Sequence, residues 1–327
     1  MLPRHFTIRA FAKINLGLKI VARRPDGFHE LRTVFQTIAL ADRLRLTVSS
    51  GRGVVVTATG WPVPAGRGNL AVRAAELAAE RFGIRGRVEI ALEKRIPLGA
   101  GLGGGSSDAA AVLRMLALAA RRRPALSALL AAARELGSDV PLFLLGGTVL
   151  GLGRGDEVYG LPDLAPWHCV LAMPRAAAGS GLATPAAFAR WDAQQRGALT
   201  EKVRSSTLME FCSLVDQVLP AFRTLRNRGS SPLPKEAAGP KVHAGIENDF
   251  LPGVLSLSPD FPRIHQQLCR SSAAWVGLTG SGAAQFGLFD RAAPGAAAAA
   301  SLARRHCSWR TRFVSRRAVR QALQMEK

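Results

Sequence analysis

The chain has few cysteines and no long hydrophobic run. Its 327 residues include only Cys169, Cys212, Cys269 and Cys307, and no two of them form a Cys-x-x-Cys pair. This spacing argues against a zinc site and a disulfide framework, and it favours a reducing compartment. No apolar run reaches the roughly 18 residues of a membrane span, and the N-terminus continues directly into a strand-like alternation. We therefore predict a cytoplasmic protein with no signal peptide and no membrane partner.

Acidic residues are scarce, since 23 Asp and Glu stand against 44 Lys and Arg, which leaves a net charge of +21. Such an excess is compatible with nucleic-acid binding. However, only 7 of the 44 basic residues are lysine, and the arginines are spread through the chain. The densest groups, residues 121–123 and 304–320, lack the interleaved aromatic residues of a single-strand binder. We expect no nucleic-acid partner, although a non-catalytic nucleic-acid binder remains the alternative from another functional class.

Glycine is concentrated in residues 97–108, which read Pro-Leu-Gly-Ala-Gly-Leu-Gly-Gly-Gly-Ser-Ser-Asp. The alternating segment 88–92 predicts a strand before this loop, and the alanine-rich run 109–120 predicts a helix after it. Glycine lets a ligand approach the backbone closely, and the first turn of a helix offers unpaired N–H groups to an anion. The arrangement predicts a phosphate-binding loop. The alternative is a surface loop that ends in a helix cap.

The loop differs from the two common nucleotide-binding motifs. No Gly-Lys-Ser/Thr ends it, as a P-loop would require. The spacing of its third glycine is wrong for a dinucleotide fingerprint, and no acidic residue follows about 20 positions later. Ser106, Ser107 and Asp108 are suited either to cap the following helix or to contact phosphate or its magnesium ion.

Single polar residues stand out elsewhere in apolar surroundings. Lys13 and Asn15 lie two apart in the strand-like segment 6–20, so they share one face, which is either solvated or part of a site. His29 follows a Pro-Asp-Gly turn, where a structural histidine is the simpler interpretation. Asp139 follows a predicted helix and precedes a proline, so it is either a helix cap or a functional acid.

The remaining pattern indicates a mixed chain of two domains. A helix is predicted from Asn69 to Arg81 and ends at Gly83. A change of composition at residues 161–166 predicts one domain at 1–161 and a second at 162–327. Residues 223–243 are typical of a surface loop, and residues 275–289 predict two strands joined by a Gly-Ser-Gly turn.

Three separated segments resemble the three motifs of the GHMP kinase superfamily: residues 12–16, 97–108 and 278–282. Further segments resemble one branch of that superfamily, which phosphorylates 4-diphosphocytidyl-2-C-methyl-D-erythritol in the non-mevalonate isoprenoid pathway: residues 24–31, 137–141, 153–156 and 248–250. The resemblance implies an α+β, two-lobed GHMP kinase fold with the active site in the cleft between the lobes. We also expect a monomer or weak homodimer.

By this resemblance, Asp139 would be the general base for transfer of the γ-phosphoryl group of ATP to the C2 hydroxyl. Lys13 would favour the charged carboxylate and stabilise the developing negative oxygen. Ser106 would approach Mg²⁺ through ATP. The implied ATP contacts are Asn69, Lys94, Pro97, Leu98, Gly99, Ala100, Gly101, Leu102, Gly103, Gly104, Gly105, Ser106 and Ser107. The implied contacts to the second substrate are Asn15, Phe28, His29, Thr184, Phe188, Gly280 and Ser281, with the two phenylalanines stacked on its cytosine.

The chain departs from the branch in three places. Phe28 stands where the family usually has tyrosine, the segment 179–185 is altered around Thr184, and residues 225–243 resemble an insertion. A GHMP kinase for homoserine or mevalonate is the alternative within the superfamily. The segment 26–29 argues against it, because a cytosine site has no purpose in such an enzyme.

Overall fold

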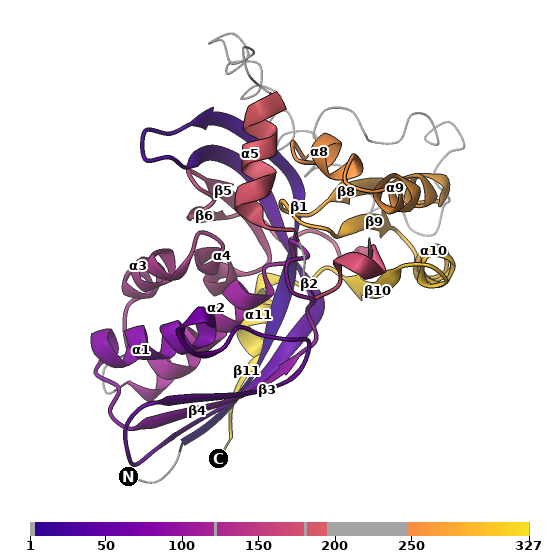
Figure 1. Cartoon of the computed structure of the whole chain (residues 1–327). Coiled ribbons are helices and arrows are strands. Elements are labelled where there is room, and N and C mark those ends of the chain that lie inside the picture. Colours follow the sequence, from indigo (N-terminus) through magenta and orange to yellow (C-terminus); the bar gives the residue numbers. More distant parts are fainter. Residues whose placement is uncertain (1–3, 121–122, 180–181, 195–247, 327) are drawn as a thin grey trace.

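The computed structural model describes residues 4–120, 123–179, 182–194 and 248–326. They form two β-sheets and the helices packed on them (Figure 1). The predicted loop and insertion at residues 223–243 and 225–243 lie outside the described residues. Within the described part of the chain, no helix combines the length and apolar character needed to cross a bilayer.

The first sheet is built on a long antiparallel hairpin of β1 (Arg4–Arg23) and β2 (His29–Ser49). The strand-like alternation at residues 6–20 belongs to one long strand, β1, and its pairing with β2 contains register shifts. Strand β4 (Arg87–Lys94), which the alternation of residues 88–92 predicted, pairs with β2. The other strands of this sheet are β3 (Val54–Gly60), β5 (Thr148–Leu152), β6 (Glu157–Gly160) and β11 (Leu323–Glu326).

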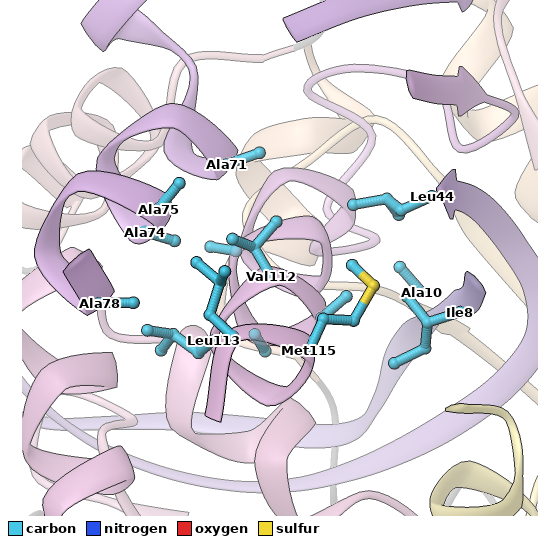
Figure 2. Packing of buried hydrophobic residues seen from close by; sticks show 14 of the residues in the cluster. Ile8, Ala10, Leu44, Ala71, Ala74, Ala75, Ala78, Val112, Leu113 and Met115 are labelled. Carbon is cyan, nitrogen blue, oxygen red and sulfur yellow. The ribbon is translucent and has the colours of Figure 1, made fainter. Parts of the chain in front are cut away.

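Helices α1 (Leu70–Phe82), α2 (Gly104–Ala119) and α4 (Val140–Leu145) pack on this sheet, and α3 (Leu126–Leu136) packs against these three helices. Helix α1 has the predicted limits, since Asn69 caps its start and Gly83 ends it at a φ of 64°. Its four buried alanines, spaced at positions i, i+3, i+4 and i+7, let α2 approach closely. Figure 2 shows this contact with the sheet side chains beside it: Ala71, Ala74, Ala75 and Ala78 of α1; Val112, Leu113 and Met115 of α2; Ile8, Ala10 and Leu44 of the sheet.

The second sheet is antiparallel, in the order β10 (Cys307–Arg312), β7 (His168–Met173), β9 (Gln285–Phe289), β8 (Trp275–Leu278). Strands β8 and β9 are joined at Gly280-Ser281-Gly282, which confirms the predicted strand pair and turn. The helices of this part are α5 (Thr184–Gln194), α8 (Leu251–Leu255), α9 (Asp260–Arg270) and α10 (Ala292–Ala303). Helix α11 (Arg316–Gln321) lies against the first sheet instead, where its Val319 packs with Phe11 and Ala41. Figure 1 shows α1 to α4 on one side of the long hairpin and the second sheet with α8 to α10 on the other.

The two sheets share a hydrophobic core. One cluster of buried residues contains Ile14 and Val34 of the first sheet together with Leu171, Leu278 and Phe286 of the second. The predicted boundary between residues 161 and 162 falls between β6 and β7, while β11 at the end of the chain pairs with β1. The division into two domains at that point stays a prediction.

The segment before α8 clamps β1 to the β8–β9 turn. The Asn248 amide donates hydrogen bonds to the carbonyls of Leu278 at 3.0 Å and Gly280 at 2.7 Å. The neighbouring Asp249 accepts a bond from the Ile20 N–H at 2.7 Å. This clamp holds the end of β1 next to the turn that completes the site described below.

Candidate active site

A cavity of about 700 Å³ is lined by residues from both parts of the fold. Strand β1, the β1–β2 turn, the glycine-rich loop, the residue before α4, helix α5 and the β8–β9 turn all contribute. It brings together most of the residues that the sequence singled out: Lys13, Asn15, Phe28, His29, Lys94, Pro97 to Ser106, Asp139, Thr184, Phe188, Gly280 and Ser281. Asn69 and Ser107 are the two predicted residues that are not part of the lining.

The glycine-rich loop brings the start of α2 to the cavity. Gly103 precedes the helix with a φ of 70°, and no side chain caps the first turn. Gly104, Gly105 and Ser106 of that turn line the cavity. Unpaired N–H groups and the positive end of the helix dipole suit an anionic group such as phosphate.

This loop also packs tightly against the β8–β9 turn. A Cβ atom on Gly101, whose φ is 77°, would lie 2.0 Å from the Thr279 carbonyl oxygen, and one on Gly282 would lie 2.3 Å from the Gly101 nitrogen. The Thr279 hydroxyl donates to the Gly101 carbonyl at 2.9 Å, and the Ala284 N–H donates to the Ala100 carbonyl at 3.1 Å. Only glycine permits two backbones to come this close.

Lys13 and Asp139 meet in the cavity. The Lys13 ammonium lies 3.5 Å from Asp139 Oδ2, and the lysine side chain is 3% exposed while that of the aspartate is 36% exposed. Asp139 directly precedes α4, yet its side chain makes no capping hydrogen bond. The carboxylate is therefore paired with the cation and open to the cavity.

Asn15 fixes this lysine. Its Oδ1 accepts hydrogen bonds from the Lys13 ammonium and from the Gly280 N–H, each at 2.8 Å. Its Nδ2 donates to Thr33 Oγ1, also at 2.8 Å. The polar atoms of Asn15 are thus engaged within the protein, where they connect the first motif to the third.

Two predicted ATP contacts have other partners. The Ser107 hydroxyl is buried and donates to the Phe11 carbonyl at 2.7 Å, which ties α2 to β1. Asn69 Oδ1 accepts the Ala71 N–H at 2.9 Å as the cap of α1. Ser106, in contrast, lines the cavity.

Lys94 is held between two buried carboxylates below the loop. Its ammonium lies 2.5 Å from Asp42 Oδ2 and 2.6 Å from Asp108 Oδ2. Asp42 Oδ1 also accepts the backbone N–H groups of Arg95 and Ile96, at 2.6 and 2.8 Å. These hydrogen bonds fix the position of the Asp42 carboxyl group.

Asp108 titrates abnormally because it is fully buried. Burial raises its pKa to about 8; the Lys94 charge opposes this shift, and the Asp42 charge adds to it. Burial by itself would lower the pKa of Lys94, but the charges of Asp108 and Asp42 outweigh this effect and raise it. At neutral pH these raised pKa values keep Lys94 charged and leave a proton on Asp108.

The opposite end of the cavity is aromatic. The rings of His29 and Phe188 stack at 4.4 Å and 14°, and His29 Nε2 lies 2.8 Å from Asp192 Oδ1. Phe28 is 50% exposed, and the Arg154 guanidinium lies 4.8 Å from the centre of its ring. The hydroxyls of Thr184 and Ser281 are hydrogen-bonded at 2.9 Å.

Sequence reasoning missed two residues that line the cavity, Arg154 and Asp192. It also missed the pairing of Asp42 and Asp108 with Lys94. Asp192 carries a usable signal, because Thr184, Phe188 and Asp192 lie four apart and so share one face of a helix. Asp42 carries none, since its pairing with Lys94 spans 52 positions and arises only from the strand register.

Comparisons with known proteins identify the family of the chain. The model for the GHMP kinases N terminal domain matches residues 69–147. A 4-diphosphocytidyl-2-C-methyl-D-erythritol kinase of Solibacter usitatus is 40% identical over 88% of this chain and 82% of its own length. The namesake of Moorella thermoacetica is 40% identical over 86% of this chain and 89% of its own.

A crystal structure of 4-(cytidine 5'-diphospho)-2C-methyl-D-erythritol kinase superposes with a TM-score of 0.72 at 33% identity, over 94% of this chain and 98% of that one. A crystal structure of mevalonate kinase shares the fold, with a TM-score of 0.64 at 12% identity. The protein is a GHMP kinase, an ATP-dependent small-molecule kinase, and the predicted α+β fold of that superfamily is confirmed. Within the superfamily, the chain belongs to the 4-diphosphocytidyl-2-C-methyl-D-erythritol kinase family.

The Asp108 proton makes stability depend on pH. The folded chain keeps this proton up to about pH 8, whereas an unfolded chain releases it near the ordinary value of 3.8. The folded state therefore binds more protons between these values, and the free energy of unfolding should fall as the pH rises through them. Asp108→Asn should flatten this fall, because the amide stays neutral throughout.

Urea unfolding at about pH 5 and about pH 8 measures how far the free energy of unfolding falls between these two values. Asp260→Asn changes an exposed carboxylate outside the cavity, and its free energy of unfolding should fall with pH as much as that of the wild type. If the free energy of unfolding of Asp108→Asn falls as much as that of the wild type, the assignment of a proton to Asp108 is wrong.

Proposed function

We propose that the chain transfers the γ-phosphoryl group of ATP to the C2 hydroxyl of 4-diphosphocytidyl-2-C-methyl-D-erythritol, giving the 2-phosphate and ADP, in non-mevalonate isoprenoid precursor biosynthesis. The observation that carries the proposal is the Lys13–Asp139 pair, with 3.5 Å between ammonium and carboxylate, in one cavity with the uncapped start of α2 and an aromatic end. The family membership of the chain supports the choice of substrate.

In the proposed reaction, Asp139 accepts the proton of the C2 hydroxyl while that oxygen bonds to the γ-phosphorus. The bond from the γ-phosphorus to the bridging oxygen of ADP breaks. Lys13 lies beside Asp139 and stabilises negative charge on the reacting oxygens during transfer. Phosphoryl transfer depends mainly on positioning and charge neutralisation, and burial together with Asn15 holds Lys13 in place.

The nucleotide would bind with its phosphates against the backbone N–H groups of Gly104, Gly105 and Ser106. Mg²⁺ would supply charge neutralisation at the phosphate oxygens, and the Ser106 hydroxyl is the side chain in this turn that would hold it. Mg²⁺ prefers to keep several waters and to bind through phosphates and one or two protein ligands. The described residues contain no group of three acidic, His or Cys ligands, and this fits an ion that arrives with the nucleotide.

The second substrate would occupy the aromatic end. Phe28 offers an exposed ring for stacking on cytosine, and His29, Phe188 and Thr184 surround the same space. One face of Phe188 already stacks on His29, so the base would use the remaining ring surface.

We further propose a cytoplasmic enzyme that acts as a monomer or weak homodimer without nucleic acid; the free thiols of Cys169, Cys269 and Cys307 fit a reducing compartment.

Turnover of ATP with Mg²⁺ tests this function. The acceptors to compare are 4-diphosphocytidyl-2-C-methyl-D-erythritol, mevalonate and homoserine, with ADP release as the readout. We expect turnover with the cytidyl compound alone. Turnover with mevalonate or homoserine instead, or with none of the three by a chain that still binds ATP, would refute the proposed acceptor.

Asp139→Asn should reduce turnover by about 10²–10⁴-fold, the usual contribution of a general base, because the amide cannot accept the hydroxyl proton. ATP affinity, measured by titration calorimetry, should stay within a few-fold, since Asp139 is proposed to contact no phosphate. Asp260→Asn serves as the matched control. Loss of ATP binding in Asp139→Asn would show that the residue belongs to the nucleotide site.

Phe28→Ala should weaken the cytidyl substrate by about 1–3 kcal/mol, the size of one lost base stack, and leave ATP affinity unchanged. Phe28→Tyr keeps the ring and should remain close to the wild type. Tyr159→Ala removes an equally exposed ring outside the cavity and should have no effect on either ligand. Equal weakening of both substrates in Phe28→Ala would be incompatible with the stacking role.

A further inference from the structure

His29 is held on several sides. Its ring stacks on Phe188 at 4.4 Å and meets the edge of Trp191 at 5.7 Å with the planes at 90°. Its Nε2 lies 2.8 Å from Asp192 Oδ1, and its side chain is only 6% exposed. An imidazole packed in this way has little freedom to turn or to exchange its two nitrogens.

The carboxylate determines which nitrogen carries the proton. An ionised carboxylate can only accept a hydrogen bond, so His29 Nε2 must be the donor. In a neutral imidazole the other nitrogen, Nδ1, then presents a lone pair. Among the described residues Nδ1 has no hydrogen-bond partner, and His29 lines the cavity.

Helix α5 places Asp192 in the cavity as well. Thr184, Phe188 and Asp192 follow one another at four-residue steps, and all three line the same space. The Asp192 side chain is one-third exposed, so it is reached by solvent from the cavity while it holds His29. The geometry thus connects a carboxylate on α5 with the ring that borders the proposed base site.

We propose that Asp192 is a positioning residue that sets the choice of base. By holding the proton on Nε2, it leaves Nδ1 of His29 as a hydrogen-bond acceptor for the base. Cytosine offers its exocyclic amino group as a donor at this edge, whereas uracil offers a carbonyl oxygen, which a lone pair repels. The site therefore selects cytidine diphosphate esters over uridine diphosphate esters. This inference rests on the proposed function.

The decisive variant is Asp192→Asn. Asparagine has the same shape, but its amide N–H can donate to Nε2 and so move the histidine proton to Nδ1, which then matches uracil better than cytosine. We expect KM for the cytidyl substrate to rise about tenfold, kcat to stay within about twofold, and the cytidine-to-uridine ratio of kcat/KM to fall at least about tenfold. Asp260→Asn is the matched control and should leave the ratio unchanged.

The assay uses the full chain at saturating ATP and Mg²⁺, with 4-diphosphocytidyl-2-C-methyl-D-erythritol and its uridine counterpart as acceptors. A merely structural role would lower kcat/KM for both acceptors alike, and an unchanged ratio would overturn the proposal. ¹⁵N NMR of histidine-labelled protein, with His29→Gln for assignment, should report a proton on Nε2 in the wild type and on Nδ1 in Asp192→Asn. A proton on Nδ1 in the wild type would also overturn it.

Failure of the proposed function is distinguishable from failure of this inference. If the wild type does not phosphorylate the cytidyl compound, the function is wrong, and binding of CDP against UDP by calorimetry then tests Asp192 without turnover. Tighter binding of CDP by the wild type, with a reduced preference in Asp192→Asn, supports the inference. Equal binding of both nucleotides by the wild type refutes it.

Discussion

The structure of the site depends on the burial of one ammonium group, that of Lys13. Removing a charge from water costs several kcal/mol unless protein groups replace the lost hydration. Asn15 and Asp139 replace it at 2.8 and 3.5 Å, and they come from β1 and from the residue before α4. Because Asn15 also binds the Gly280 N–H, the same contact connects the first motif to the β8–β9 turn. The cation proposed to stabilise phosphoryl transfer is thus also the centre around which the motifs assemble.

A second constraint is the close approach of two backbones. The glycine-rich loop and the β8–β9 turn cross at Gly101 and Gly282, where any Cβ atom would overlap main-chain atoms. The start of α2 beside this crossing has a glycine, Gly103, at its cap position and no side-chain cap, so that its N–H groups remain for a ligand. Lys94 is also bound by the carboxyl groups of Asp42 and Asp108, and these contacts join β2, β4 and α2. The phosphate end of the cavity is therefore rigid on both sides.

The charge of the whole chain fits the proposed chemistry. ATP and a cytidine diphosphate ester are both polyanions, and a net charge of +21 attracts them before any specific contact is made. Within the cavity, Lys13 lies beside Asp139, the proposed general base, and Arg154 lies over the ring of Phe28. Nucleic-acid binding by scattered arginines would not require cations at these positions. The cavity is therefore more informative about function than the net charge.

Local patterns in the sequence were sufficient for the elements and for the chemistry they present. The glycine loop between a strand and a helix, the helix that ends at Gly83 and the Gly-Ser-Gly turn all depend on short-range backbone preferences, which neighbouring residues express directly. Recognition of the superfamily also came from short motifs, each contained within a few residues.

Tertiary structure alone decided how the polar groups are used. Ser107 and Asn69 match a nucleotide site by sequence, yet the fold directs Ser107 to the Phe11 carbonyl and Asn69 to the start of α1. Asp42 meets Lys94 through strand register, and Asp192 meets His29 across 163 positions. A side chain's partner is whichever group the packed chain places within hydrogen-bond distance. The sequence by itself determined which groups were available, and only the packing of distant segments decided which of them remain free to bind a ligand.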